Sequence, residues 1–233
     1  MRDQPGEPVP PQAPENPPPS QPAINLPPLT LWLAVALVAV HVLRDYLLSP
    51  AGDYALMLRF AFIASNWLSG PGLADLPTPI THMLLHASWA HLIFNTGFLI
   101  AFGAGLERAL GARRLMLALG AGGVAGAAAQ FLADPASPVP MVGISDGVSA
   151  LFAMAMMALA IRSGGWRRLA AVTALWLALN LGFGLIGIPG DPTIVIAWQA
   201  HVGGYFAGMA YGFPLGPQGP PGRRRGAQPP PPA

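Results

Sequence analysis

Long runs of apolar residues, separated by short polar or proline-containing segments, follow one another along most of the chain. Six of these runs predict membrane-spanning helices, at about residues 30–49, 88–108, 112–133, 145–162, 168–187 and 198–215. A helix rises about 1.5 Å per residue, so roughly 20 residues cross a hydrocarbon core about 30 Å thick. The pattern therefore predicts an all-α membrane protein in which six transmembrane helices form a bundle.

Both ends of the chain differ from this apolar middle. Residues 1–29 contain eleven prolines and no apolar run, so we expect a disordered cytoplasmic tail that is not a removable signal peptide. Residues 216–233 are rich in proline and arginine, and we expect a second disordered cytoplasmic tail there. The membrane domain is predicted to cover residues 30–215.

The distribution of arginine predicts the orientation in the membrane. All twelve basic residues are arginine, and with the amino terminus inside only Arg44 and Arg59 fall on the outer side. Because basic residues near the ends of spans are retained in the cytoplasm, both termini are expected to be cytoplasmic. We expect a multi-pass protein of a bacterial inner membrane.

Composition excludes several functional classes. Charged residues make up 9% of the chain, against about 25% in soluble domains, and 53% of the chain is hydrophobic, so the lipid bilayer is its expected partner. A net charge of +2 gives little support to nucleic-acid binding. The sequence has no cysteine, which excludes disulfides, thiolate metal sites and a thiol protease. We expect no cofactor.

The segment 50–81, between the first two predicted spans, is too long for a tight turn and too mixed in character for another span. Because it contains Ala61, Phe62 and Ile63, we expect it to lie partly in the outer membrane interface. A functional loop, a reentrant loop and a plain surface loop all fit this pattern.

Strongly polar side chains within or next to the predicted spans are few, and they are grouped. They are His82, His86, His91, Asn95, Ser145, Asp146 and His201. Such groups cost free energy in a membrane, so by default they mark a functional or packing site that faces the protein interior. One pocket near the outer ends of the second, fourth and sixth spans could gather them. Buried histidines that only help the helices to pack are the alternative.

No metal site is expected. His82 and His86 have the i, i+4 spacing of helical zinc ligands, but the residues between them are Met83, Leu84 and Leu85. No glutamate stands where a His-Glu-x-x-His motif places its general base.

Ser145 and His201 are the candidate catalytic pair. Serine is a weak nucleophile until a base removes its proton, and histidine is the usual base near neutral pH. The two residues lie on different predicted spans, so only close helix packing could join them. Gly204 and Gly208 form a G-x-x-x-G row after His201, which favours such an approach.

His91 and Asn95 stand four residues apart, so both side chains leave the same face of the second predicted helix. Two hydrogen-bond donors that converge at one point could hold an oxyanion. They would complete a hydrolytic site if Ser145 lay close by.

In type, spacing and order, these residues resemble the rhomboid family of intramembrane serine proteases. The matching elements are His82, His86, His91 and Asn95, then Gly103, Glu107 and Gly111, then Gly143 and Ser145, and finally Ala200, His201, Gly204 and Gly208. The resemblance implies a rhomboid-like bundle of six helices. It also implies a serine endopeptidase whose substrates are transmembrane segments of other proteins, cleaved near the outer face.

The resemblance assigns the catalytic roles as follows. Ser145 is implied as the nucleophile and His201 as the general base, a dyad without a third carboxylate. His91 and Asn95, with the Ser145 backbone N–H, are implied as the oxyanion hole. Substrate is expected to enter by movement of the loop 188–197 and the fifth span.

Supporting roles are implied for three more residues. His82 and Gln130 are similar to residues that hold catalytic water near the dyad, and Glu107 is similar to a structural residue at the cytoplasmic end of its span. Pro77 and Thr78 stand where family members often carry a Trp-Arg pair, which puts the details of substrate entry in question.

Asp146 departs from the family, which usually has glycine after the nucleophile. Stabilisation of its carboxylate by the helix dipole is the interpretation we favour. Alternatively, Asp146 repels the oxyanion or crowds the last span, or it binds a nearby donor and regulates the site. This residue keeps open a pseudoprotease that binds transmembrane clients without cleaving them. A small transporter or channel, the other alternative, predicts polar residues distributed across the whole bilayer depth.

Overall fold

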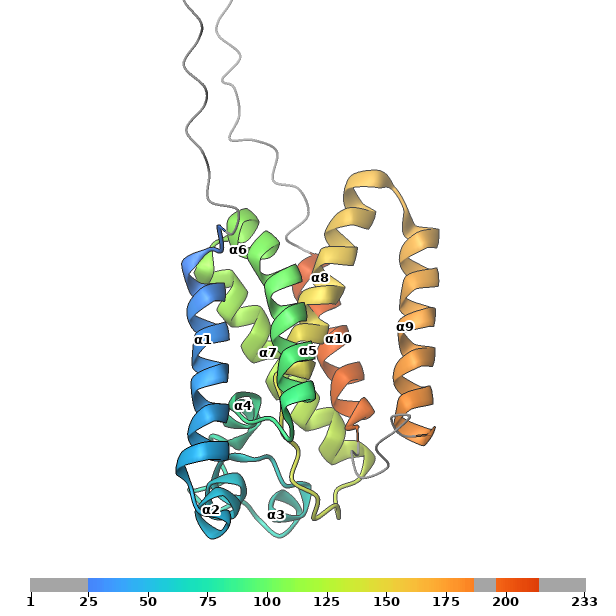
Figure 1. The fold of residues 1–233 in the computed structure, drawn as a ribbon. Helices are drawn as coiled ribbons and strands as arrows, with labels where there is room; N and C mark the ends of the chain where they lie inside the picture. The colour runs from blue at the N-terminus through green and yellow to red at the C-terminus, as the bar shows by residue number, and fades with distance from the viewer. Residues whose placement is uncertain (1–24, 187–195, 214–233) are drawn as a thin grey trace, which may run out of the picture.

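The computed structural model describes residues 25–186 and 196–213, and its elements are helices joined by short connections (Figure 1). The elements are α1 (Pro28–Val42), η1 (Leu43–Leu47), α2 (Pro50–Phe60), α3 (Ala64–Leu68), α4 (Thr78–Thr81), η2 (His82–Leu84), α5 (Trp89–Phe98), η3 (Leu99–Gly103), α6 (Ala104–Leu110), α7 (Ala112–Ala133), α8 (Ser145–Ser163), α9 (Trp166–Ile186) and α10 (Trp198–Gly212). The segments η1 and η3 are π-helical turns that continue α1 and α5. No β-strand occurs within the described ranges.

Five helical segments are long and apolar enough to cross a membrane: Pro28–Leu47, Trp89–Leu110, Ala112–Ala133, Ser145–Ser163 and Trp166–Ile186. They coincide with the first five predicted spans to within a few residues. Helix α10 occupies the sixth predicted span with 15 residues, fewer than the roughly 20 that a perpendicular crossing needs. The all-helical membrane architecture is therefore confirmed, and five spans are long enough on their own.

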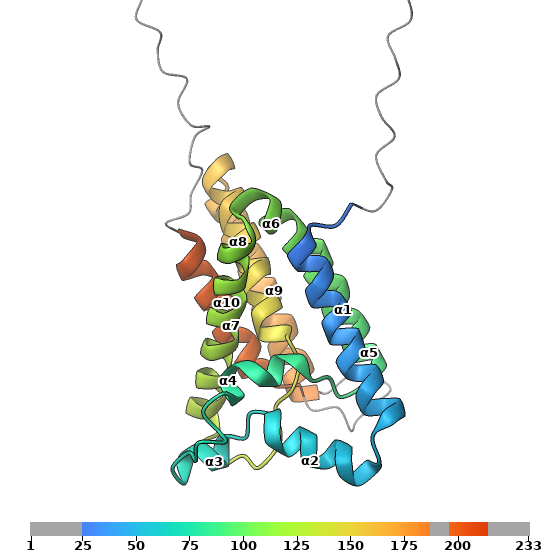
Figure 2. The ribbon, with the colours of Figure 1, turned by 90° about the vertical axis from the view of Figure 1, so that its left-hand side faces the viewer.

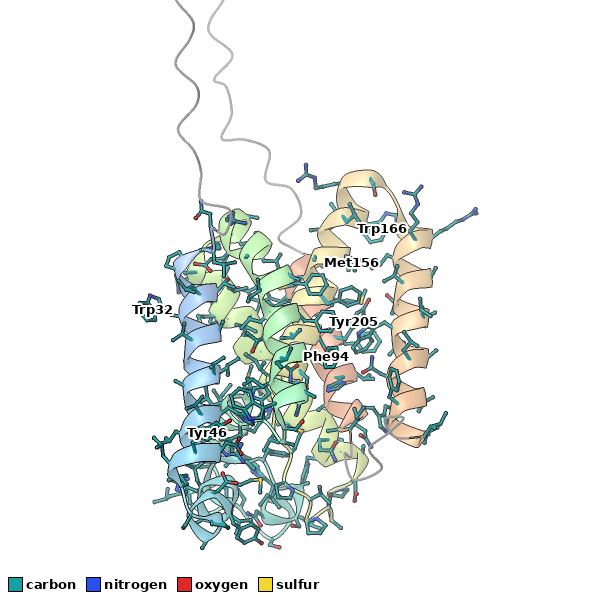
Figure 3. The ribbon with its side chains drawn as sticks, in the orientation of Figure 1. Trp32, Tyr46, Phe94, Met156, Trp166 and Tyr205 are labelled. Atoms are coloured by element: carbon teal, nitrogen blue, oxygen red, sulfur yellow. The ribbon has the colours of Figure 1, made fainter. Side chains whose placement is uncertain are left out.

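The outer surface of the bundle is apolar. Trp32 projects from α1 away from the other helices (Figure 3) and is 67% exposed, and Tyr46, in the η1 turn that continues α1, is 69% exposed. Phe94 on α5 is equally exposed, at 69%. In water such a surface would be unfavourable, but lipid tails solvate it, so these side chains suit a helix that faces the bilayer.

Helices α7, α8 and α10 form the centre of the bundle. Along α10, Gly204 lies against the backbone of Asp146 and Gly208 against that of Ala150, so a methyl group at either glycine would collide with a carbonyl oxygen of α8. Gly203 meets α7 in the same way. In lipid, where the hydrophobic effect does not drive helices together, such backbone contact is a main source of packing energy. The predicted role of the G-x-x-x-G row is confirmed.

Helix α9 lies at the edge of the bundle (Figure 1), and its principal neighbours are α8 and α10. Leu169 is its one buried residue, whereas Leu175, Leu179 and Leu185 are at least half exposed. Because so little of its surface contacts protein, α9 is the least firmly packed of the long helices.

Helices α2, α3 and α4 gather at one end of the bundle, where α2 lies across the helix axes (Figure 2). We call this the α2–α4 end. Ala61, Phe62 and Ile63, the residues behind the expectation that this segment lies partly in the outer membrane interface, are buried in protein there, and the depth of the segment in the membrane stays a prediction. The Phe62 N–H donates to the Met141 carbonyl at 3.1 Å, and the Met141 N–H donates to that of Phe62 at 2.8 Å. This pairing holds the segment against the loop that leads into α8.

Arg44, one of the two arginines assigned to the outer side, organises the α2–α4 end. Its guanidinium donates to Asp53 at 2.7 and 3.3 Å and to the His86 carbonyl at 2.8 Å, and the residue is 8% exposed. The side chain thus joins the end of the α1 segment to α2 and to the loop before α5. Its burial explains why it departs from the arginine distribution of the remaining chain.

Glu107 closes the opposite end of α1. Its carboxylate accepts hydrogen bonds from the Leu29 N–H, the Thr30 N–H and the Thr30 hydroxyl at 3.0, 2.7 and 2.7 Å. The first turn of a helix has N–H groups without intrahelical partners, and a carboxylate there satisfies them and suits the helix dipole. This geometry agrees with the structural role expected for Glu107.

Parts of the sequence-based predictions lie outside the described residues. These parts are residues 1–24 of the predicted amino-terminal tail, the whole carboxy-terminal tail 216–233, and most of the loop 188–197.

Candidate active site

Ser145 is the first residue of α8, and the turn before it is tightly constrained. Gly143 has φ of +117°, a conformation that favours glycine over any residue with a Cβ atom. Its N–H donates to the His82 carbonyl at 3.0 Å. The sharp turn brings the serine to the amino terminus of α8, where backbone N–H groups are free to bind an anion.

His201, in the first turn of α10, meets this serine. The distance between Ser145 Oγ and His201 Nε2 is 2.7 Å. The glycine contacts of α10 with α8 begin at Gly204, one turn after His201, and they bring the two backbones close enough for this bond. The structure therefore joins the predicted pair across 56 residues of sequence.

The other ring nitrogen of His201 has a partner that the sequence analysis missed. His201 Nδ1 lies 2.7 Å from Oδ1 of Asn180 on α9, and the Asn180 amide nitrogen donates to the Trp176 carbonyl at 2.9 Å. Asn180 is a strongly polar residue inside an otherwise apolar span. The same reasoning that singled out the histidines would have found it, since an amide is also costly in a membrane.

His91 and Asn95 both face the turn before Ser145. A Cβ atom placed on Gly143 would lie 2.7 Å from His91 Nε2 and 3.5 Å from Asn95 Nδ2. The Ala87 N–H points to His91 Nδ1 at 3.4 Å, which favours the tautomer with the ring proton on Nε2. The buried Asn95 Nδ2 has no acceptor among the described residues. Two side-chain donors thus converge at the turn that leads into Ser145.

His82 and Asp146 form a buried pair. His82 Nε2 lies 2.8 Å from Asp146 Oδ2, and His82 Nδ1 lies 2.9 Å from the Thr78 carbonyl. Asp146 Oδ1 also accepts the Gly147 N–H at 2.7 Å. Both ring nitrogens of His82 therefore have protein partners, which does not favour its predicted role in holding water. Of the three interpretations of Asp146, binding to a nearby donor describes this contact.

Gln130 and His86 are the remaining polar residues of the predicted cluster. Gln130 lies on α7 one turn after Gly126, which packs against the Asp146 side chain and the Ala200 carbonyl. Within the described residues, Gln130 Oε1 is buried without a hydrogen-bond partner, and so are both ring nitrogens of His86. The His86 ring lies edge-on to that of His91, with centroids 5.1 Å apart.

The four histidines that were expected in one pocket have three different surroundings. His86 and His91 are neighbours, His201 pairs with the serine, and His82 is turned to Asp146. Over residues 25–186 and 196–213, no three side chains of histidine, cysteine, aspartate or glutamate come together as a metal site would require. The arrangement pairs a serine with a histidine and places two hydrogen-bond donors nearby, which are the groups that acyl transfer by a serine would require.

Comparison with known proteins identifies the family. The rhomboid domain family matches residues 75–218. Rhomboid protease GluP of Bacillus subtilis is 34% identical over 136 residues, which are 58% of this chain and 26% of that protein. Rhomboid-related protein 2 of the mouse is 32% identical over 145 residues, which are 58% of this chain and 46% of that protein. The chain thus spans less than half of the length of either relative. This integral multi-pass membrane protein belongs to the rhomboid family.

Proposed function

We propose that the chain is an intramembrane serine endopeptidase that cleaves transmembrane segments of other membrane proteins near the outer face. The observation that carries the proposal is the 2.7 Å contact between Ser145 Oγ and His201 Nε2. The similarity to a relative named rhomboid protease supports it. No cofactor is needed for this chemistry, because the serine, the base and the oxyanion donors all come from the chain.

The proposed reaction has two stages. His201 Nε2 takes the proton of the Ser145 hydroxyl as Oγ attacks the scissile carbonyl, and it then gives this proton to the leaving amine. The acyl-enzyme is hydrolysed by water that His201 activates in the same way. The oxyanion of each tetrahedral intermediate accepts hydrogen bonds from His91 Nε2, Asn95 Nδ2 and the Ser145 backbone N–H. Gln130, whose carbonyl oxygen is buried and free of a partner among the described residues, is the better candidate for holding that water.

We propose that the α2–α4 end faces the outside, with both termini cytoplasmic and α10 as the sixth span, in a bacterial inner membrane. The 19 residues of α8 measure roughly 28 Å at about 1.5 Å per residue. If Arg162 and the α8–α9 turn lie at the cytoplasmic surface, Ser145 lies below the outer surface. Water must then reach the dyad from the outer side.

A helical substrate hides its carbonyls in its own hydrogen bonds, so it must unwind before Ser145 can attack. We therefore propose that preferred substrates contain small or helix-breaking residues at the cleavage site. Helix α9, at the edge of the bundle, is the proposed entry gate, because its movement would disrupt the fewest contacts.

The alternative of a pseudoprotease rested on Asp146. Its carboxylate accepts from His82 and from the Gly147 N–H, and these two contacts satisfy both oxygens without involving the serine. This geometry supports a catalytically competent site. Client binding without cleavage would leave the paired Ser145 and His201 without a function.

A fluorophosphonate probe and a reporter transmembrane substrate test the proposal together. Purified wild-type protein should react with the probe and cleave the reporter, whereas Ser145→Ala and His201→Ala should do neither. If Ser145→Ala cleaved the reporter as fast as the wild type does, the result would contradict the proposal. Reporter binding without cleavage or labelling in the wild type would favour the pseudoprotease.

A further inference from the structure

Asn180 is held in one orientation by its own helix. Its Nδ2 donates to the Trp176 carbonyl at 2.9 Å, one turn earlier on α9. An amide nitrogen only donates and an amide oxygen only accepts, so the partner of Nδ2 fixes which atom faces away from it. The atom that faces His201 Nδ1, at 2.7 Å, is accordingly the acceptor Oδ1.

This orientation determines the tautomer of His201. An acceptor at Nδ1 requires that Nδ1 carry the proton, since a neutral imidazole has one donor and one acceptor nitrogen. The lone pair is then on Nε2, which lies 2.7 Å from Ser145 Oγ. A base with the opposite tautomer would present N–H to the serine and could not take its proton.

We propose that Asn180 is a positioning residue that selects the active tautomer of His201 and orients its ring. The site is then a hydrogen-bonded series of serine, histidine and asparagine, in which the third member is an amide and not a carboxylate. The inference rests on the proposed protease function and deepens it. Asn180 acts through His201 and touches neither the serine nor the reacting atoms.

Because Asn180 lies on α9, its hydrogen bond to His201 can form only while α9 is packed against α10. The α9 residues that meet α10 are Thr173, Trp176, Asn180 and Gly184. They follow a helical spacing, so they form one stripe on a helix that is otherwise largely exposed. Thr173 bonds to the Tyr205 hydroxyl at 2.7 Å, and Trp176 stacks on the Tyr205 ring with centroids 4.4 Å apart. Figure 3 shows Tyr205 between the two helices. When α9 moves outward, His201 therefore loses its orienting partner.

Four variants of the full chain separate positioning from helix docking. Asn180→Leu removes the acceptor at nearly constant volume, and Asn180→Asp keeps an acceptor but adds a charge. Thr173→Val removes a polar contact of the same stripe without touching His201. Leu179→Ala, at a position 50% exposed, controls for substitution on α9. Reporter cleavage is measured as kcat and KM separately, with the thermal midpoint of each variant in detergent.

Asn180→Leu should lower kcat by roughly ten- to a hundredfold, part of the about 10²–10⁴-fold that a positioned base contributes, with KM changed less than about threefold. Thr173→Val and Leu179→Ala should keep kcat within about threefold of wild type. A kcat for Asn180→Leu that equals the wild-type value, or a loss no larger than that of Thr173→Val, would overturn the inference.

The pH dependence of kcat/KM in Asn180→Asp distinguishes positioning from a purely structural role, which would leave it unchanged. A carboxylate beside Nδ1 stabilises the protonated ring, which cannot act as a base, so the acidic limb of the kcat/KM profile should move by about one pH unit to higher pH. Asp146 and His91, the other titratable groups that influence His201, stay unchanged in this variant. If the acidic limb of Asn180→Asp lay at the same pH as that of the wild type, the inference would be overturned. This result does not depend on whether Asn180→Leu folds. Failure of the protease proposal is distinguishable, because the wild type would then either fail to cleave the reporter or cleave it no faster than Ser145→Ala.

Discussion

The carboxylate of Asp146 lies 2.8 Å from the Nε2 atom of His82, and the two side chains are 2% and 1% exposed. The residue after Ser145 thus contacts the segment between α4 and α5, and its carboxylate does not bond to Ser145 or His201. The other ring nitrogen of His82 lies 2.9 Å from the Thr78 carbonyl, so both nitrogens of this buried histidine have partners within the protein. From the sequence, repulsion of the oxyanion or crowding of the last span were alternatives for this carboxylate.

Removal of the Asp146 side chain should lower the stability of the fold more than the reactivity of Ser145. Asp146→Ala leaves His82 Nε2 buried without a partner, and breaking a buried pair costs about 3–5 kcal/mol. We expect a clearly lower midpoint of thermal unfolding in detergent, together with wild-type fluorophosphonate labelling of the protein that remains folded. Asp134→Ala, at an exposed position, is the matched control. If Asp146→Ala kept its thermal midpoint, the buried pair would be unimportant for stability.

The contact of α10 with α8 should tolerate no added methyl group. Gly208→Ala places a Cβ against the Ala150 carbonyl, and such overpacking costs about 1–3 kcal/mol and separates the helices. Because Gly208 and His201 lie on the same helix, labelling of Ser145 should also slow. Gly97→Ala is the control, since Gly97 has nothing within 4 Å of an added Cβ. Equal labelling rates for the two variants would show that this contact does not set the dyad distance.

Arg44 should stabilise the α2–α4 end. Arg44→Met leaves the buried His86 carbonyl and the partly exposed Asp53 without their donor, and a buried carbonyl that loses its partner costs about 1–3 kcal/mol. Hydrogen exchange of residues 50–88 should then increase, while exchange in α7 stays low. Arg59→Met, which removes an exposed hydrogen bond to the Ala74 carbonyl, should have a much smaller effect. Similar exchange in both variants would contradict this assignment.

Asn95 should act on the transition state and not on the fold. Asn95→Leu removes a donor without a protein partner in the described part of the chain, so the thermal midpoint should change little. If Asn95 holds the oxyanion, kcat should fall by about 10²–10³-fold with KM nearly constant. His91→Ala should show a similar loss of kcat. The loss in the double variant should be smaller than the product of the two single losses. A loss confined to KM would assign Asn95 to substrate binding instead.

The sequence predicted the spans well because lipid imposes a simple rule. A run such as residues 112–133 must be helical and apolar to cross the membrane, and the observed α7 has the same bounds. The pairing of Ser145 with His201 was also predictable, because the α10 glycines indicated which face of that helix approaches its neighbour.

Other features depend on tertiary contacts that no local pattern encodes. Ala61, Phe62 and Ile63 have the composition of interfacial residues, and they are buried by tertiary contacts such as those of Phe62 with Met141, Ala127 and Ala200. The partner of Asp146 lies 64 positions away, beyond the reach of helix periodicity. Asn180 was detectable as a lone amide among apolar residues, but its partner became evident only from the packing of α9 on α10.

The chain that enters α8 is fastened at two points to the α2–α4 end, by Met141 to Phe62 and by the Gly143 N–H to the His82 carbonyl. The backbone N–H of Ser145, at the start of α8, is therefore held by the α2–α4 end in addition to the packing of α8. We expect the affinity for an oxyanion mimic to stay constant between thin and thick bilayers, even where the thickness changes how readily α9 leaves the bundle. Recognition of the transition state and admission of the substrate would then respond to different physical properties of the membrane.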